Sequence, residues 1–157
     1  MMREVVEKLV QKGMTISTME SCTGGYIASA ITDIENASKV LSFSAVTYSN
    51  DAKIKMGVDE NVIKTYSVYS MKTADEMSKN IAHYANSSLG VGITGQINRK
   101  DEQNPTKEQD KVYISIFDVE KNVFYQEILQ TVSGTRQKNK ELIGSKVKEM
   151  LMHILSL

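Results

Sequence analysis

Apolar side chains recur every three or four residues in several segments of the chain, which is the spacing of one face of an α-helix. The first such segment covers residues 2–12 and is followed by Gly13, a common helix stop. The same spacing predicts helices over 23–36, 51–56, 59–66, 71–85 and 135–157. Asp59 is a plausible N-cap of the fourth of these six helices.

Other segments are short, apolar and rich in β-branched or aromatic residues, and these predict strands. The predicted strands cover residues 14–20, 41–49, 89–95, 112–119 and 123–132. The last two are separated only by Glu120-Lys121-Asn122, which predicts a hairpin. The glycines of Leu89–Gly95 indicate that another element packs closely on that strand. Strands that alternate with helices before a hairpin predict an α/β protein, specifically a three-layer α/β/α sandwich with a mixed β-sheet.

Residues 96–111 interrupt this alternation. The segment is almost wholly polar and contains the only proline of the chain, so it predicts a long surface loop or a lid. The chain has 157 residues, of which 41% are hydrophobic, and it contains neither a linker nor an internal repeat. We therefore expect residues 1–157 to form a single domain.

The charge balance excludes some classes of partner. Acidic and basic side chains number 19 each, so no overall field would hold nucleic acid or an anionic membrane. No apolar segment approaches the roughly 18 residues of a membrane span, and no signal peptide is evident. A single cysteine, Cys22, and two histidines predict neither a disulfide nor a metal site. We expect a cytoplasmic protein that needs no cofactor and binds a small molecule.

The turn between the first predicted strand and the next helix has the sequence STMESCTGGY, residues 17–26. A strand, a tight turn and a helix would place the N–H groups of Cys22–Gly25 where they can bind a phosphate or an oxyanion. The alternative is that Ser21 or Thr23 is only a helix N-cap. The segment is not a Walker loop, a dinucleotide fingerprint or a G-x-S-x-G elbow, so the turn alone does not decide between these interpretations.

A second segment, VTYSNDAK at residues 46–53, changes this balance. It places Tyr48 at a strand end and Lys53 in the following helix, so both can face one cleft together with Ser21. A serine hydroxyl becomes a nucleophile when a base accepts its proton, and a neutral lysine can be that base. A weaker interpretation makes Cys22 a thiol nucleophile paired with His83.

The two segments resemble the A-E-S-C-T-G-G and V-T-Y-S-N-x-A-K motifs of the CinA C-terminal domain family, which includes nicotinamide-nucleotide amidases. Residues 68–70 and Gly92-Ile93-Thr94-Gly95 are similar to two further family motifs. The resemblance implies an α/β/α sandwich that hydrolyses the carboxamide of nicotinamide mononucleotide to the acid and ammonia. It also implies that Ser21 is the nucleophile, Lys53 the base and Tyr48 a partner in proton transfer. The implied substrate-binding residues are Cys22, Thr23, Gly24, Gly25, Thr94, Gly95 and Arg136.

The chain departs from the family pattern in two places. The family loop I-A-G-P-x-G-G, which borders the substrate, is replaced by a segment that begins Gln96-Ile97-Asn98. The family motif G-D-R appears as Gly134-Thr135-Arg136, which keeps the arginine and loses the acid. An alternative is therefore a nucleotide-binding member of the same fold that is not catalytic or has altered specificity. The apolar run at residues 150–155 fits either a homodimer contact or a core helix.

Overall fold

The computed structural model describes residues 1–98 and 110–157. In chain order the elements are α1 (Arg3–Lys12), β1 (Ile16–Glu20), α2 (Tyr26–Thr32), the short 3-10 helix η1 (Ala37–Lys39), β2 (Ser44–Val46), α3 (Asn50–Lys55), α4 (Glu60–Tyr66), α5 (Met71–Ala85), β3 (Leu89–Gly95), β4 (Lys111–Asp118), β5 (Val123–Gln130) and α6 (Arg136–Leu155).

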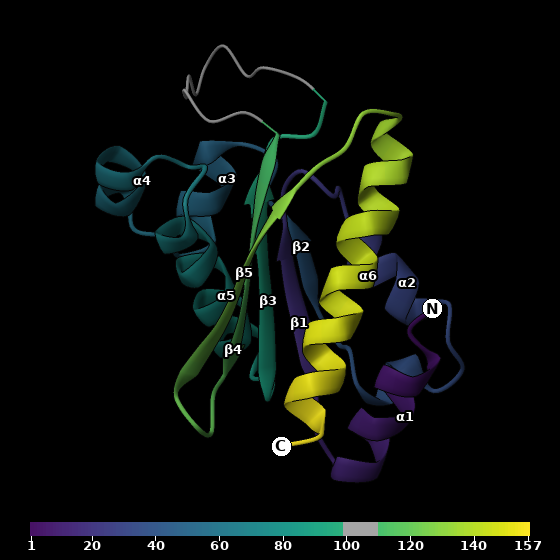
Figure 1. Cartoon of the computed structure of the whole chain (residues 1–157). Coiled ribbons are helices and arrows are strands. Elements are labelled where there is room, and N and C mark those ends of the chain that lie inside the picture. Colours follow the sequence, from purple (N-terminus) through teal and green to yellow (C-terminus); the bar gives the residue numbers. More distant parts are fainter. Residues whose placement is uncertain (99–109) are drawn as a thin grey trace.

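The five strands form one mixed sheet in the order β2-β1-β3-β4-β5. β1 runs parallel to β2 and β3, whereas β4 is antiparallel to both β3 and β5. Helices α1, α2 and α6 cover one face of the sheet and α3, α4 and α5 cover the other (Figure 1). The predicted three-layer α/β/α sandwich with a mixed sheet is therefore confirmed.

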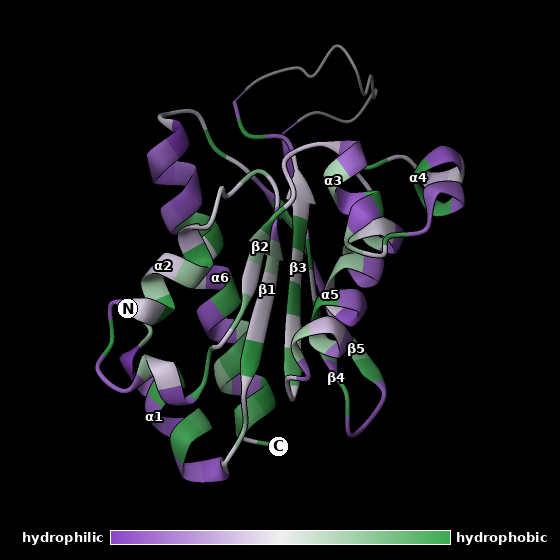
Figure 2. Cartoon of the chain, turned by 180° about the vertical axis from the view of Figure 1, so that it is seen from behind, coloured by the Kyte–Doolittle hydropathy of each residue, from purple (hydrophilic) through white to green (hydrophobic). Residues whose placement is uncertain are grey.

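Each face of the sheet has its own apolar cluster. The larger cluster lies under α1, α2 and α6, and the smaller one, under α5, contains Met19, Val58, Met77 and Ile81. Figure 2 shows apolar residues along β1 and β3 and on the flanking helices, whereas the first turns of α6 are hydrophilic. Burial of these two clusters between the layers supplies the main driving force for the fold.

The close packing predicted for β3 is present between β3 and α5. A Cβ atom at Gly90 would lie 2.1 Å from the Ser78 carbonyl oxygen, and one at Gly92 would lie 2.4 Å from the Ala74 carbonyl oxygen. No side chain fits at these distances, so glycine at both positions lets α5 lie directly on the strand.

Two elements are shorter than the sequence pattern predicts. The helix expected over 23–36 covers only Tyr26–Thr32, and the strand expected over 41–49 covers only Ser44–Val46. Gly24 and Gly25 have φ values of 62° and 97°, so the chain is left-handed there and the helix begins after them. The extra residues preceding α2 form the turn that carries Ser21.

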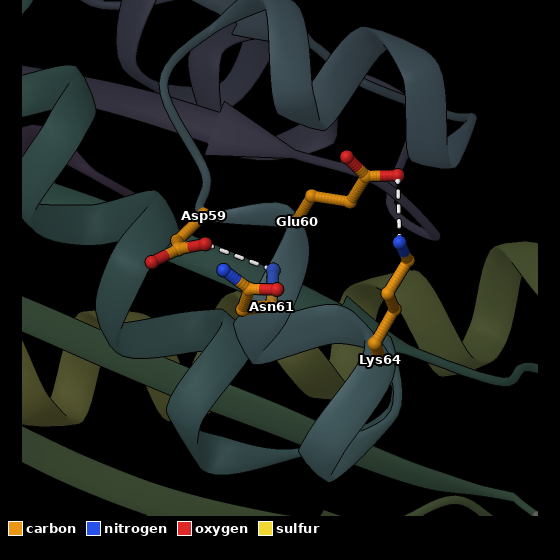
Figure 3. A network of polar contacts seen from close by, with 4 residues as sticks. All are labelled: Asp59, Glu60, Asn61 and Lys64. Atoms are coloured by element: carbon orange, nitrogen blue, oxygen red, sulfur yellow. Dashed lines mark hydrogen bonds and ion pairs between the residues drawn. The ribbon is translucent and has the colours of Figure 1, made fainter.

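The predicted cap at Asp59 is confirmed. Its carboxylate accepts a hydrogen bond of 2.8 Å from the backbone N–H of Asn61, at the start of α4 (Figure 3). Glu60 and Lys64 form an ion pair of 3.4 Å one turn apart. Both side chains of the pair are largely exposed, so the cap matters more to this short helix than the pair does.

The apolar run at residues 150–155 lies largely in the core. Met150, Leu151, Ile154 and Leu155 are all buried side chains of α6. Packing within the domain accounts for these side chains, so the predicted homodimer gains no support from them. Among the described helices, none has the length and apolar content that a membrane span requires.

Candidate active site

The parallel strands β2, β1 and β3 end at the same edge of the sheet, and the ladder continues one residue beyond β1 and β2. The Thr47 N–H donates to the Glu20 carbonyl oxygen at 2.7 Å, and the Ser21 N–H donates to the Ile93 carbonyl oxygen at 3.1 Å. Successive side chains of a strand point to opposite faces, so Ser21 faces the same side as Met19, toward α3 and α5.

Lys53 meets Ser21 at this edge. Its Nζ donates to Ser21 Oγ at 2.9 Å and to the Thr47 carbonyl oxygen at 2.7 Å. The Lys53 side chain is 2% exposed and Ser21 is 8% exposed. The predicted nucleophile and the predicted base are thus in direct contact within a site that largely excludes bulk water.

The start of α3 determines where Lys53 lies. Ser49 caps this helix by accepting a 3.1 Å hydrogen bond from the Ala52 N–H. The Lys53 N–H then donates to the Ser49 carbonyl oxygen in the first turn. The short connection from β2 to this capped turn leaves Lys53 directly beside the end of β1.

Glu20 points to the opposite face of β1, toward α2. Its carboxylate accepts four hydrogen bonds of 2.7 to 3.0 Å, two from side-chain hydroxyls and two from backbone N–H groups. The hydroxyl donors are Thr18 and Thr23, and the N–H donors are Ile27 and Ala28. This fully buried carboxylate fastens the turn that carries Ser21 to the first turn of α2.

The N–H groups of Cys22–Gly25, which were expected to bind an anion at a helix N-terminus, lie in the turn that precedes α2. Glu20 already occupies the N–H groups at the start of α2, and neither Ser21 nor Thr23 caps the helix through its side chain. In the described part of the chain, the N–H groups of Cys22, Thr23 and Gly25 make no hydrogen bond to a backbone carbonyl. Any anion held here would be bound by the turn itself and not by α2.

Three other predicted site residues lie around the Ser21–Lys53 pair. Tyr48 is 63% exposed and, within residues 1–98 and 110–157, makes no hydrogen bond to either member of the pair. Thr94 is fully buried and donates to the Val68 carbonyl oxygen at 2.9 Å. Gly95 abuts β4, because a Cβ there would lie 2.5 Å from the Lys111 carbonyl oxygen.

Three basic residues, Arg136, Lys138 and Lys140, lie at the start of α6, and two of them bear on the site. Arg136, predicted from the family motif, is exposed in the first turn. Lys140, one turn later, was not predicted, and its Nζ would lie 3.5 Å from a Cβ atom at Gly24. The only sequence signal for Lys140 was its i, i+4 spacing from Arg136, which places both on one side of α6.

The alternative with a thiol nucleophile is wrong. Burial raises the pKa of the Cys22 thiol to about 12, and the smaller opposing effect of the Lys53 charge does not offset this. The His83 ring packs against Phe117 at a centroid distance of 5.8 Å. No contact joins Cys22 to His83 among the residues that the structure describes, and no group of three potential metal ligands occurs among them.

The expectation of a surface loop from residue 96 onward is wrong at its start. Gln96 and Ile97 are each only 4% exposed, and Ile97 belongs to the larger apolar cluster. Asn98 forms hydrogen bonds with Asn139 of α6 and with the carbonyl oxygen of Gly134, two residues before that helix. The polar composition of this segment led to the prediction of a surface loop, whereas its first residues extend β3 and are buried in the fold. Residues 99–109 of the predicted loop lie outside the described residues.

Comparison with known proteins assigns nearly the whole chain to a single protein family. The sequence matches the model of the CinA C-terminal domain over residues 1–155. A competence-damage inducible protein of Caldanaerobacter subterraneus subsp. tengcongensis is 41% identical over 139 residues, which are 87% of this chain and 33% of that protein. The chain thus spans about a third of the length of this curated relative.

Solved structures agree with the architecture. The competence/damage inducible protein CihA from Agrobacterium tumefaciens has a TM-score of 0.84 and 26% identity, covering 98% of this chain and 94% of that one. A CinA superfamily protein from Escherichia coli has a TM-score of 0.86 and 24% identity, covering 98% of this chain and 90% of that one. At that identity, the second match supports the fold alone.

Proposed function

Because the chain belongs to the CinA C-terminal domain family, we propose that it is an amidohydrolase that converts nicotinamide mononucleotide to nicotinic acid mononucleotide and ammonia. The observation that carries the proposal is the 2.9 Å contact between Lys53 Nζ and Ser21 Oγ in a buried site. A solvated lysine and a cap serine would have no reason to meet there. Their contact supplies the nucleophile and base that amide hydrolysis needs.

The proposed reaction begins when the neutral Lys53 amine accepts the Ser21 hydroxyl proton. Ser21 Oγ bonds to the carboxamide carbon, and the C–N bond then breaks while Lys53 returns the proton to the departing nitrogen, releasing ammonia. Water attacks the resulting ester, again giving its proton to Lys53, and the serine leaves as the hydroxyl. The net change is amide plus water to acid plus ammonia.

The turn and α6 supply the remaining contacts in this proposal. The N–H groups of Cys22 and Thr23 follow the nucleophile and would stabilise the oxyanion. Lys140, close to Gly24, and the exposed Arg136 would attract the phosphate of the nucleotide. Tyr48 is exposed and directly follows Thr47, whose carbonyl oxygen accepts a hydrogen bond from Lys53, and it would assist proton transfer once a substrate covers it.

The test is ammonia release from the purified chain with nicotinamide, nicotinamide riboside and nicotinamide mononucleotide, together with chromatographic detection of each acid. We expect the mononucleotide to be the best of the three, because only it has a phosphate for the α6 cations. Ser21→Ala is the matched control for contaminating amidases. Binding of the mononucleotide without ammonia release would instead indicate a nucleotide-binding member of the fold.

A further inference from the structure

Two polar side chains near Ser21 are buried without a partner. Among the described residues, both polar atoms of the Gln96 amide and the Thr47 hydroxyl oxygen have no hydrogen bond. Gln96 is only 4% exposed, so bulk water cannot supply the hydrogen bonds that its amide lacks. Buried polar groups in native proteins are almost always paired, and an unpaired amide destabilises the fold. A functional site can keep such a group when a bound ligand supplies the missing hydrogen bond.

The strand pattern shows which way Gln96 faces. Ile93 and Ile97 both belong to the cluster under α6, and Thr94 instead bonds Val68 on the opposite side. Side chains alternate along an extended chain, so Gln96 faces the same side as Thr94. Ser21 faces that side too, as its contact with Lys53 requires.

The register places Gln96 within reach of a molecule on Ser21. Ser21 is bonded to the backbone of Ile93, which puts it level with Thr94 on the adjacent strand. Gln96 is two residues further along, so its Cα lies roughly 8 Å from that of Ser21, given strand spacings of about 4.8 Å and 3.3 Å per residue. A glutamine side chain covers much of that separation.

We propose that Gln96 is a specificity-determining residue whose side-chain oxygen accepts a hydrogen bond from the NH₂ of the substrate carboxamide. The inference rests on the proposed function for the identity of the ligand. An amide offers both an acceptor and a donor, so it complements another carboxamide. A ligand without the NH₂ leaves the buried Gln96 oxygen unpaired, and sites built on such a bond reject the analogue that lacks it.

The experiment compares two ligands in the Ser21→Ala background, where turnover is removed. The ligands are nicotinamide mononucleotide and its 3-acetylpyridine analogue, which keeps the carbonyl and replaces NH₂ with methyl. Calorimetry should show about tenfold tighter binding of the carboxamide, the effect of one hydrogen bond. Adding Gln96→Met should weaken carboxamide binding by about tenfold and leave the analogue nearly unchanged.

Gln126→Met, on β5 at the far edge of the sheet, is the matched control. The Gln126 amide is paired with the Asp75 carboxylate, so its loss should lower Tm and leave both affinities unchanged. Gln96→Met should maintain or raise Tm, because it removes unpaired buried groups. If Gln96→Met does not fold, Gln96→Leu makes the same test.

The outcomes separate this inference from the proposed function. If the wild-type chain releases ammonia but Gln96→Met binds both ligands like its parent, or weakens both equally, Gln96 is not a specificity residue and the amidase proposal stands. If the chain binds with the expected discrimination but releases no ammonia, the amidase proposal fails and the role of Gln96 stands. If the parent binds neither ligand, the role of Gln96 is overturned, and the amidase proposal is overturned with it when the wild-type chain also releases no ammonia.

Discussion

The two faces of β1 at its carboxyl end differ in how their polar groups are paired. On the face toward α2, the Glu20 carboxylate is fully buried and accepts four hydrogen bonds. On the face toward α3, Ser21 and Lys53 are paired, whereas the neighbouring Gln96 amide and Thr47 hydroxyl have no partner among the described residues. The Glu20 face is fully paired and holds the turn in place, whereas the Ser21 face keeps buried polar groups that the described residues leave unpaired.

This difference predicts that adjacent residues on the two faces have different roles, one in the stability of the fold and the other in the reaction. Changes on the Glu20 face should lower the free energy of unfolding and have a smaller effect on the reaction. Changes on the Ser21 face should have a large effect on the reaction and a small effect on the free energy of unfolding. Ligand-binding sites contain polar groups that stay without hydrogen bonds until the ligand is bound, so these groups add little stability to the fold. The four predictions below test that separation, beginning with the largest effect.

Ser21→Ala should reduce kcat/KM for carboxamide hydrolysis by at least about a thousandfold, because the nucleophile is lost. Its Tm should stay close to that of the wild type, since only one hydroxyl is removed. Cys22→Ala should cost far less activity. Steady-state ammonia assays and thermal melts of both variants check this, and a larger loss for Cys22→Ala would contradict the serine mechanism.

Lys53→Arg should reduce kcat by about a hundredfold or more, because arginine keeps its proton and cannot act as the base. Lys53→Met is the companion variant without any charge and should be similarly inactive. In the wild type, kcat/KM should rise with pH and then level off, because only the neutral amine accepts the serine proton. A Lys53→Arg enzyme with normal kcat would identify another group as the base.

Glu20→Gln should lower the free energy of unfolding by about 2 to 3 kcal/mol, because an NH₂ group would face donors that now meet a carboxylate oxygen. Urea denaturation measures this change. At temperatures where the variant is folded, its kcat/KM should remain within about tenfold of wild type. A stable Glu20→Gln protein that has lost its activity would overturn the division between the two faces.

Alkylation of Cys22 should be slow, which is the smallest effect expected. With a pKa raised to about 12 by burial, the thiol is almost entirely protonated at pH 8. An unperturbed thiol with a pKa near 8.5 would ionise appreciably there. Iodoacetamide incorporation, followed by mass spectrometry, should rise about tenfold per pH unit and still be rising above pH 10 in the folded protein. Rapid labelling at pH 8 that levels off there would show that the pKa of the half-buried Cys22 thiol is not raised.

Local patterns predicted much of the fold and the centre of the site. α5 and β3 match their predicted bounds, and the hairpin through Glu120-Lys121-Asn122 is present. Apolar spacing, caps and turn residues act over a few positions, so one sequence suffices to read them. Two motifs that resemble those of a known family predicted that Ser21 and Lys53 share one site, and the structure places the two side chains in contact.

Contacts between distant segments were not visible in the sequence. No sequence pattern predicted that Lys140 lies close to Gly24 or that N–H groups of α2 bond the Glu20 carboxylate. Gln96 looked like the start of a polar surface loop and is buried beside β4. The burial of Gln96 depends on which strands lie side by side, and the position of Lys140 depends on where α6 packs against the turn. Periodicity within one segment carries no information about either.

The amino-acid sequence by itself determined the α/β class, most of the elements and the presence of a serine, lysine and tyrosine set near strand ends. It did so because side-chain periodicity and turn chemistry are properties of neighbouring residues. Only the tertiary structure decided the strand order, the contact between Ser21 and Lys53, and which buried polar groups are paired. The reason is that hydrogen-bond satisfaction and burial are set by residues that meet across the sheet, 32 positions apart in the case of Ser21 and Lys53.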